Sequence, residues 1–372
     1  MSKQVLLFYI SRYSGHFRAA EAIRNALLEL DGSLGIEMID AFDYANPVLG
    51  RIITRAYLEI IKKKPDLWGN IYDNPDVLKK ARKAREALHK YNKPKMKRLL
   101  DAFAPEGVYC TQAFPCGMVA DYKKTYGNNV PLIGVLTDHA PHSYWLFDEV
   151  DIYVVPSKKS ADILEQKGVP PEKIRIYGIP VDSGFRREHE KDRIRADYGL
   201  LSERPTVLIM GGSQGLGDME GVVRSFLGDR EHCYQLLVVT GTNRRLYKRL
   251  TGLIPSGNDL VRVFPYIENI EELMEVSDII ITKAGGMTTA ETLAKRLPML
   301  IVNPIPGQER MNTEHLVAGG AALEVRDYNK IHDVINELFG PGDTLKRMKE
   351  NAERLAMPDS ALKIGELVVK GF

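Results

Sequence analysis

The sequence predicts an α/β protein with two domains, each built on a parallel β-sheet that helices cover on both faces. Three observations predict this fold class. The chain has 372 residues, which exceeds the length that a single hydrophobic core normally supports. Short apolar runs alternate with helical patterns. This alternation occurs twice, on either side of a segment at residues 178–185 that contains glycine and proline.

The predicted strands are short runs of four to six mainly apolar residues, which indicates that both of their faces are buried. In the first half they are residues 5–10, 107–111, 132–136 and 152–155. In the second half they are residues 206–210, 235–240, 261–264, 279–282 and 299–302. We expect one Rossmann-like domain over residues 1–185, a second over 186–350, and a C-terminal helical segment, 351–372, that crosses back to the first domain.

Composition excludes several classes of protein. Hydrophobic residues make up 44% of the chain and charged residues 27%, so neither a collagen-like nor a disordered bias is present. No apolar run reaches the roughly 18 residues that a membrane-spanning helix needs, and residues 5–10 are too few for a signal-peptide core. The protein is therefore expected in the cytoplasm. Cys110, Cys116 and Cys233 are too scattered for a disulfide framework or a zinc site, and we expect them to be packing residues.

Basic residues are concentrated in one part of the first half. Residues 62–98 contain thirteen Lys or Arg against four Asp or Glu. Just before them, apolar pairs recur every four residues between positions 48 and 61, with Arg51 and Arg55 interleaved, which predicts an amphipathic helix. Two interpretations remain open: ordinary helices with solvated faces, or a surface for an anionic partner, either lipid or nucleic acid.

The loop after the first predicted strand carries the first candidate for catalysis. Residues 11–16 end in Gly15 and His16 and precede a predicted helix over residues 17–28. A helix N-terminus is therefore expected at the carboxyl edge of the sheet, where open α/β folds bind ligands. A neutral imidazole can remove a proton from an attacking hydroxyl, which makes His16 a candidate base. The alternative is a histidine that only caps the helix.

A second loop at the same edge follows the third predicted strand. In this loop Asp138 could orient His16 or an acceptor hydroxyl, and Trp145 could offer an apolar wall. A metal site formed by Asp138, His139 and His142 is conceivable. No helical or hairpin spacing favours such a site, and we predict no metal.

In the second half, two glycine-rich turns join a strand to a helix. The first, residues 211–217, includes Gly211, Gly212 and Ser213. Such a turn cradles phosphate through backbone N–H groups and the positive end of the helix. Its spacing matches neither the dinucleotide fingerprint nor the P-loop, which disfavours a dehydrogenase or a P-loop NTPase. A plain tight turn is the alternative interpretation.

The second turn, residues 282–288, contains Gly285 and Gly286, and Glu291 follows one turn into the helix. Two glycines let the backbone approach a diphosphate, and a carboxylate can accept hydrogen bonds from a ribose diol. After the next predicted strand, Gln308 and Glu309 place an amide and a carboxylate where sugar hydroxyls would lie. Residues 279–309 therefore predict a site for a nucleotide sugar.

Several motifs are shared with a known family. They are Tyr13-Ser14-Gly15-His16, Asn46-Pro47, Pro65-Asp66-Leu67-Trp68, Thr137-Asp138 with Trp145, Lys283-Ala284-Gly285-Gly286, Glu291 and Pro306-Gly307-Gln308-Glu309. Through these motifs the chain resembles the diacylglycerol glycosyltransferases, the monogalactosyl- and monoglucosyl-diacylglycerol synthases of glycosyltransferase family 28, over nearly its whole length.

The resemblance implies a GT-B fold, with two Rossmann-like domains facing a central cleft, and an inverting, metal-independent reaction. It makes His16 the base or an acceptor-site residue, Glu291 the ribose ligand, and Gln308 with Glu309 the ligands of the donor sugar. The predicted donor-binding set is completed by Gly211, Gly212, Ser213, Gly285, Gly286, Met287 and Thr288, with the uracil against the backbone around Tyr266 and Ile267.

The sequence departs from the family pattern in two places. Tyr13 and Ser14 stand where the family usually shows a Gly-Asn pair, which leaves the backbone path beside His16 open. Residues 211–215 look like the related peptidoglycan glycosyltransferase that adds N-acetylglucosamine to a polyprenyl-linked precursor. The N-terminal loop of that enzyme is richer in glycine, and residues 46–72 look like the diacylglycerol group, which we therefore favour.

We predict a UDP-sugar-dependent hexosyltransferase that transfers glucose or galactose to the hydroxyl of diacylglycerol, with no cofactor besides the donor substrate and no nucleic-acid partner. The basic region is expected to associate peripherally with the anionic inner face of the cell membrane. Three alternatives are a UDP-N-acetylglucosamine transferase acting on a polyprenyl-linked precursor, a UDP-sugar epimerase and a noncatalytic nucleotide-sugar binder.

Overall fold

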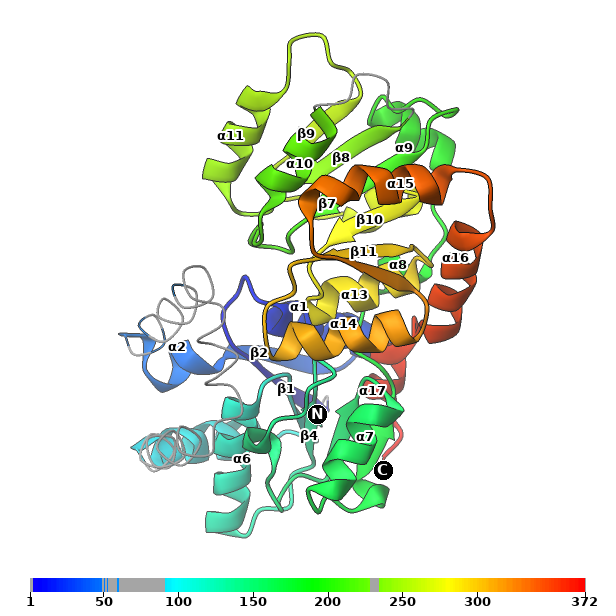
Figure 1. Ribbon diagram of the computed structural model, residues 1–372. Helices are drawn as coiled ribbons and strands as arrows, with labels where there is room; N and C mark the ends of the chain where they lie inside the picture. The colour runs from blue at the N-terminus through cyan, green and yellow to red at the C-terminus, as the bar shows by residue number, and fades with distance from the viewer. Residues whose placement is uncertain are drawn as a thin grey trace. The chain divides into compact units, whose positions relative to one another are not determined.

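The computed structural model describes residues 3–48, 50, 52, 59, 91–227 and 234–371. The chain divides into two compact units: Met1–Ser183 with Pro306–Gln308 and Asp359–Phe372, and Gly184–Ile305 with Glu309–Pro358. Each unit contains one six-stranded sheet whose neighbouring strands are all parallel (Figure 1). The predicted fold class, α/β with two Rossmann-like units, is confirmed.

The first unit alternates strands and helices along the chain. Its strands are β1 (Gln4–Tyr9), β2 (Gly35–Asp40), β3 (Gly107–Cys110), β4 (Leu132–Val135), β5 (Ile152–Val155) and β6 (Ile174–Ile176). Its helices are α1 (Gly15–Leu30), α2 (Ala41–Ala45), a helix over residues 91–103, α6 (Ala113–Tyr126), α7 (Lys158–Gln166) and α17 (Ser360–Val369), with the 3-10 turns η1 (Ser143–Trp145) and η2 (Pro171–Lys173). The sheet order is β2-β1-β3-β4-β5-β6.

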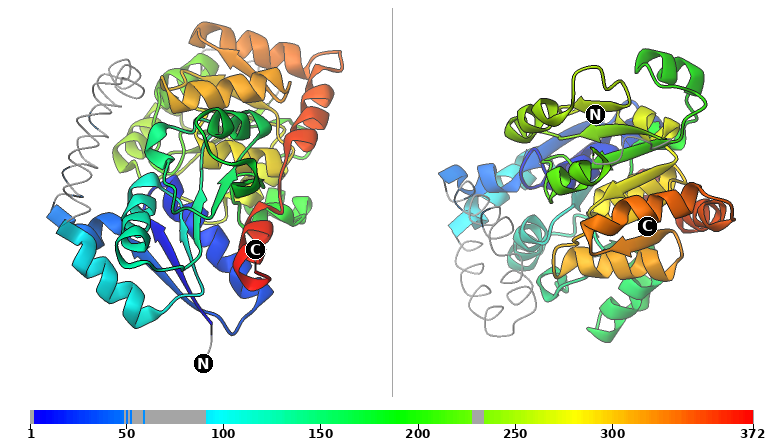
Figure 2. Two further views of the ribbon diagram at one scale, coloured as in Figure 1. Left: turned by 90° about the horizontal axis from the view of Figure 1, so that it is seen from below. Right: turned by 45° about the horizontal axis from the view of Figure 1, so that its top comes forward.

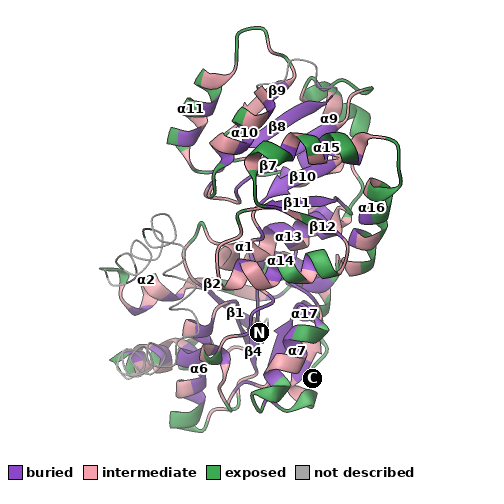
Figure 3. Cartoon of the chain, in the orientation of Figure 1, coloured by how far each residue is buried: buried purple, intermediate pink, exposed green. Residues whose placement is uncertain are grey.

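Successive residues of β1 point to opposite faces of the first sheet, and both faces are buried. Leu6 and Phe8 join an apolar cluster with residues of α6 and α7. Val5 and Leu7 join a second cluster with residues of α1 and α17. Burial on both sides explains why β1 has a continuous apolar run instead of an alternating pattern. Figure 3 shows the central strands buried and the helices exposing their outer sides.

The C-terminal helix α17 belongs to the first unit and packs against α1 (Figures 1 and 2). Gly365 permits this close approach, since a Cβ there would lie 3.0 Å from the nearest side-chain atom of α1. Tyr109 Oη, on β3, donates a hydrogen bond to the Ile364 carbonyl at 2.9 Å. Ser360 Oγ donates to the Ile179 carbonyl at 2.8 Å. These bonds attach both the beginning and the middle of α17 to the rest of the unit.

The second unit and its borders carry six more strands and nine helices among the described residues. The strands are β7 (Thr206–Met210), β8 (Gln235–Val239), β9 (Val261–Phe264), β10 (Ile279–Thr282), β11 (Met299–Val302) and β12 (Ala322–Val325). The helices are α8 (Ser183–Arg186), α9 (Lys191–Asp197), α10 (Met219–Leu227), α11 (Arg244–Leu253), α12 (Ile270–Val276), α13 (Gly286–Ala294), α14 (Gln308–Ala318), α15 (Ile331–Phe339) and α16 (Thr344–Leu355), with the 3-10 turn η3 (Tyr328–Lys330). The sheet order is β12-β11-β10-β7-β8-β9.

One face of the second sheet is covered by α10, α11 and α15. Val207 and Ile209 of β7 lie in the apolar cluster that these helices complete. Elsewhere in the unit, α9 packs against α12, and α13 packs against α16. The sheet is thus the centre of a separate hydrophobic core, as expected for a chain of this length.

Each sheet has one point at which the order of strands reverses. In the first unit β2 and β3 lie on opposite sides of β1, and in the second β8 and β10 lie on opposite sides of β7. Open α/β sheets bind ligands beyond the carboxyl ends of their strands at such a switch point. The loops after β1 and β3, and after β7 and β10, are therefore the places where site residues are expected.

The nine predicted strands agree with observed strands to within one residue at each end. Three further strands were not predicted, and β2, β6 and β12 all lie at sheet edges. Edge strands lack a neighbour on one side and are only partly buried here, so their sequences carry no continuous apolar run. The segment at residues 178–185, which separates the two predicted halves, runs into α8, and α9 follows it.

Several predicted features lie outside the described residues. These are most of the amphipathic helix at 48–61, the basic region as far as residue 90, the motif at 65–68 and Cys233. Cys110 and Cys116 are buried in the first unit as unpaired thiols. Within the described ranges, no helix has the length and apolar character that crossing a bilayer requires.

Candidate functional site

His16 lies in the first turn of α1, directly after the loop that follows β1. Ser14 caps this helix, because its Oγ accepts a hydrogen bond from the Phe17 N–H at 3.3 Å. The same hydroxyl donates to the Ile10 carbonyl at 2.5 Å. The cap is therefore supplied by Ser14, and the His16 ring is turned toward Thr111, the residue that follows β3 across the switch point.

The hydrogen bonds of His16 fix which ring nitrogen carries the proton. Nδ1 lies 2.7 Å from the Thr111 carbonyl oxygen and 3.2 Å from Thr137 Oγ1. A carbonyl oxygen can only accept, so Nδ1 donates its proton and the lone pair of the neutral ring is on Nε2. The Thr111 hydroxyl in turn donates to the His16 carbonyl at 2.9 Å. Both the ring and the backbone of His16 are thus held by the loop after β3.

The environment of His16 also sets its charge. Burial lowers its pKa from 6.5 to about 4, although the bond to the Thr111 carbonyl acts in the opposite direction. The imidazole is therefore neutral at neutral pH. Neutral imidazole with its lone pair on Nε2 is the form that removes a proton from a hydroxyl.

The loop after β4 carries Asp138, which is partly buried. Its neighbour His139 is buried, with Nδ1 3.0 Å from Ser157 Oγ, while Ser160 Oγ donates to the His139 carbonyl at 3.2 Å. These bonds attach the loop to the N-terminus of α7. Trp145, in η1, is only 4% exposed, and its indole lies in the core of the first unit.

The turn after β7 depends on glycine for its own shape. Gly212 has a φ of 70° and Gly215 a φ of 54°, in the left-handed region that favours glycine. A Cβ on Gly211 would lie 2.2 Å from the Leu216 carbonyl oxygen, and one on Gly215 would lie 2.1 Å from the Thr240 carbonyl oxygen. The backbone of this turn therefore accounts for Gly211 and Gly215 without a ligand.

The turn after β10 begins at Lys283 and ends at the first residue of α13, Gly286. Gly285 is the N-cap of this helix, and no side-chain hydrogen bond caps it. The N–H groups of the first turn carry the positive end of the helix dipole. Thr288 and Glu291 follow on the same helix, and each is 8% exposed.

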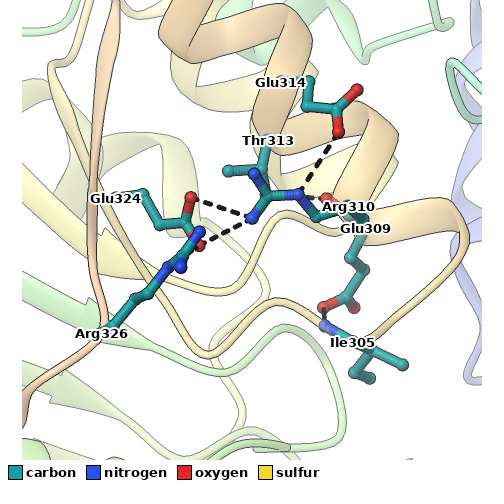
Figure 4. Close-up of polar contacts among 7 residues, drawn as sticks. All are labelled: Ile305, Glu309, Arg310, Thr313, Glu314, Glu324 and Arg326. Carbon is teal, nitrogen blue, oxygen red and sulfur yellow. Dashed lines mark hydrogen bonds and ion pairs between the residues drawn. The ribbon is translucent and has the colours of Figure 1, made fainter. Parts of the chain in front are cut away.

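Glu309 lies in the first turn of α14 and is itself almost buried. Its Oε1 accepts from Lys283 Nζ at 2.5 Å, and its Oε2 accepts from the Ile305 N–H at 2.9 Å. Figure 4 shows Glu309 turned toward Ile305, whereas the neighbouring Arg310 turns toward Glu324, to which it donates at 2.7 and 2.9 Å. Adjacent residues of α14 thus serve two separate ion pairs.

The remaining predicted residues lie at the first turns of helices or in the loops that follow strands. Gly15 is the first residue of α1, and Gln308 is the first residue of α14. Ser213 and Met287 are partly buried, in the turn after β7 and in the first turn of α13. Tyr266 and Ile267 follow β9, which β8 separates from β7.

The His, Cys, Asp and Glu side chains of the described residues are the candidate metal ligands. Among them, no group of three or more His, Cys, Asp or Glu side chains is placed to hold a metal ion. Asp138, His139 and His142 are part of this described set. The arrangement of these three residues therefore differs from that of a metal centre.

Two residues at the switch points were not among the predicted site residues. Thr111 holds His16 through its backbone carbonyl, which no side-chain motif reveals. Lys283 belongs to a motif but no role of its own was predicted for it, yet its ammonium donates a hydrogen bond to Glu309. Both residues directly follow a strand next to the switch point, and this position would have identified them once the strand order was known.

The two Rossmann-like units define the GT-B class of fold. MurG of Acinetobacter baumannii aligns with a TM-score of 0.65 at 15% identity, covering 99% of this chain and 100% of that one. The UDP-GlcNAc 2-epimerase of Neisseria meningitidis, solved with UDP-GlcNAc bound, aligns with a TM-score of 0.64 at 16% identity, covering 99% and 100%. At these identities the likeness shows the fold alone.

The family follows from the amino-acid sequence. Residues 16–181 match the family model of monogalactosyldiacylglycerol (MGDG) synthase, and residues 206–364 match that of the glycosyltransferase family 28 C-terminal domain. The processive diacylglycerol beta-glucosyltransferase of Bacillus cereus (strain AH187) is 30% identical over 367 residues, 98% of this chain and 93% of the relative. The chain belongs to the diacylglycerol glycosyltransferases of glycosyltransferase family 28 and is a transferase enzyme. The predicted resemblance and enzyme class are confirmed.

Proposed function

We propose that the protein transfers a hexose from a UDP-sugar to the hydroxyl of diacylglycerol, with inversion at the anomeric carbon and without a metal ion. The observation that carries this proposal is the match to a diacylglycerol glucosyltransferase, which runs through both units instead of the nucleotide-binding half alone. An acceptor shared with that relative is supported because the N-terminal match, to the monogalactosyldiacylglycerol synthase model, begins at His16 itself.

The proposed chemistry is a direct displacement. The acceptor oxygen forms a bond to C1 of the hexose while the bond from C1 to the diphosphate oxygen breaks, and the diphosphate leaves with the electron pair. His16 Nε2 takes the proton of the acceptor hydroxyl. Because the pKa of His16 is only about 4, the ring is a weak base. The proton is therefore transferred while the new bond forms, when the hydroxyl becomes strongly acidic. The N-terminus of α13 stabilises the charge on the diphosphate.

In the same proposal, Glu291 binds the ribose and the residues around Gly285 and Gly286 bind the diphosphate. Glu291 is supported by its burial on the helix that begins at Gly286. A carboxylate that accepts hydrogen bonds from both ribose hydroxyls orients the ribose and raises the affinity for the nucleotide. Parallel assays with UDP-glucose and UDP-galactose decide which hexose is transferred.

We also propose that the protein associates peripherally with the anionic inner face of the cell membrane. Val48 and Ile52, beside the basic region, are 64% and 59% exposed. Apolar side chains next to clustered Lys and Arg favour an interfacial site on anionic lipid. Flotation with vesicles that contain anionic lipid should recover the protein at low salt and lose it at high salt. No recovery at either salt concentration would contradict this part of the proposal.

The role of His16 is tested by separating binding from transfer. A His16→Ala variant should bind UDP with unchanged affinity in calorimetry while its transfer rate falls at least about a hundredfold, the lower range for loss of a general base. His332→Ala, on α15 of the second unit, is the matched control and should keep the parent rate. Equal transfer by His16→Ala and the parent would contradict the assigned role.

A further inference from the structure

Lys283 has a position that its sequence motif does not explain. It directly follows β10, the strand beside the switch point of the second sheet, and its side chain is only 16% exposed. A Cβ on Gly285 would lie 3.1 Å from Lys283 Nζ, and a Cβ on Gly212 would lie 3.8 Å from Lys283 Cε. The lysine side chain therefore lies between the two glycine-rich turns.

A side chain at position 285 would meet this ammonium and little else. Among the described residues, Lys283 Nζ is the one non-neighbouring heavy atom within 4 Å of a Cβ on Gly285. Gly285 has a φ of −71° and a ψ of 135°, which any residue adopts, so its backbone does not require glycine. Gly211 differs, because a Cβ there would collide with the backbone of its own turn. Glycine at 285 thus keeps room beside the lysine instead of serving the packing of the chain.

The lysine is held in place from α14. Glu309 Oε1 accepts one of the three N–H donors of Lys283, and Asn312 Nδ2 donates to the Ala284 carbonyl at 2.9 Å. Glu309 is in turn fixed by the Ile305 N–H. A cation that is neutralised by one carboxylate can stay in a mostly buried position and keeps donors for a second anion.

We propose that Lys283 binds the diphosphate of the donor directly and that Glu309 positions its ammonium. This inference rests on the proposed function, of which it names the diphosphate ligand. The ligand that this requires is an anion with several oxygens, which can approach the ammonium beside Gly212 and Gly285, two residues without a side chain. In a site without a metal ion, such a lysine supplies a full positive charge next to the leaving group, which a helix dipole alone does not.

Calorimetry with UDP and uridine tests the proposal, since the two ligands differ only in the diphosphate. Lys283→Met should lower the affinity for UDP roughly 10- to 100-fold, the range for a lost hydrogen bond to a charged group, and leave the affinity for uridine unchanged. Because Lys283→Met leaves Glu309 buried without its partner, the double variant Lys283→Met with Glu309→Gln is measured as well. The double variant removes both charges. Its affinity for UDP should fall by the same factor, and its affinity for uridine should stay unchanged.

Lys295→Met is the matched control. Lys295 follows the opposite end of the same helix, α13, and also forms a buried ion pair, with Glu275 at 2.7 Å. This variant should bind UDP as the parent does. UDP affinity within about twofold of the parent in Lys283→Met would overturn the inference, as would equal losses for UDP and uridine in both Lys283 variants. A parent protein that binds uridine and UDP equally weakly would instead refute the proposed donor.

Discussion

The lowered pKa of His16 predicts how the stability of the first unit depends on pH. The unfolded chain has the ordinary value of 6.5, and the folded chain has a pKa of about 4. Between these values the unfolded state binds more protons, so the contribution of His16 is fully present above pH 6.5 and is lost as the pH falls toward 4. From pH 7 to pH 5 the free energy of unfolding should fall by about 2 kcal/mol through this residue.

A His16→Gln variant isolates this contribution from that of the carboxyl groups. The glutamine amide keeps an N–H donor for the Thr111 carbonyl but does not titrate. Both proteins are unfolded in urea at the two pH values. Tryptophan fluorescence reports on the first unit through Trp145, whose indole lies in the core of that unit.

The parent should lose about 2 kcal/mol more than His16→Gln between pH 7 and pH 5. Losses that agree within the error of the urea extrapolation would mean that His16 is not held neutral in the folded state. That result would contradict both the assigned tautomer of His16 and its assignment as the base. A pH profile of transfer that breaks near 6.5 would lead to the same conclusion.

Three further predictions follow from other parts of the chain. Glu291→Ala should weaken UDP binding roughly 10- to 100-fold in calorimetry but leave binding of inorganic diphosphate unchanged, and equal losses for both would exclude a ribose contact. Tyr109→Phe should lower the free energy of unfolding in urea by about 1–2 kcal/mol, because the Ile364 carbonyl loses its buried donor, and an unchanged value would show that this bond does not hold α17. Treatment with a chelator should leave the transfer rate unchanged, and a loss that added Mg²⁺ restores would contradict a metal-independent reaction.

The strands in the middle of each sheet could be predicted from the sequence because both of their faces are buried. Residues 206–210 and 279–282, for example, are apolar apart from Thr206 and Thr282, and they form β7 and β10 with the predicted bounds. At three of the four sheet edges, in β2, β6 and β12, the same reasoning fails. In β2 all six residues are partly or fully exposed, so burial imposes no apolar run on them.

The candidate site was predictable where chemistry depends on a side chain and not where it depends on the backbone. His16 stands out by its residue type and its place at a helix N-terminus, but its tautomer depends on the carbonyl of Thr111, 95 positions away in the chain. The sequence suggests that Trp145 could offer an apolar wall, but the packing of its indole in the core of the first unit depends on contacts that only the fold reveals. Lys283 required knowledge of the distance between two turns that are about seventy positions apart.

The most direct test of the proposed activity is identification of the product. Purified protein is incubated with UDP-glucose, UDP-galactose or UDP-N-acetylglucosamine, each with vesicles that contain diacylglycerol or a polyprenyl-linked precursor, and the lipids are analysed by mass spectrometry. We expect a hexosyl-diacylglycerol from UDP-glucose or UDP-galactose, and at least about a hundredfold less of it from His16→Ala. Transfer to the polyprenyl-linked precursor alone, or conversion of a UDP-sugar in the absence of any acceptor, would contradict this account.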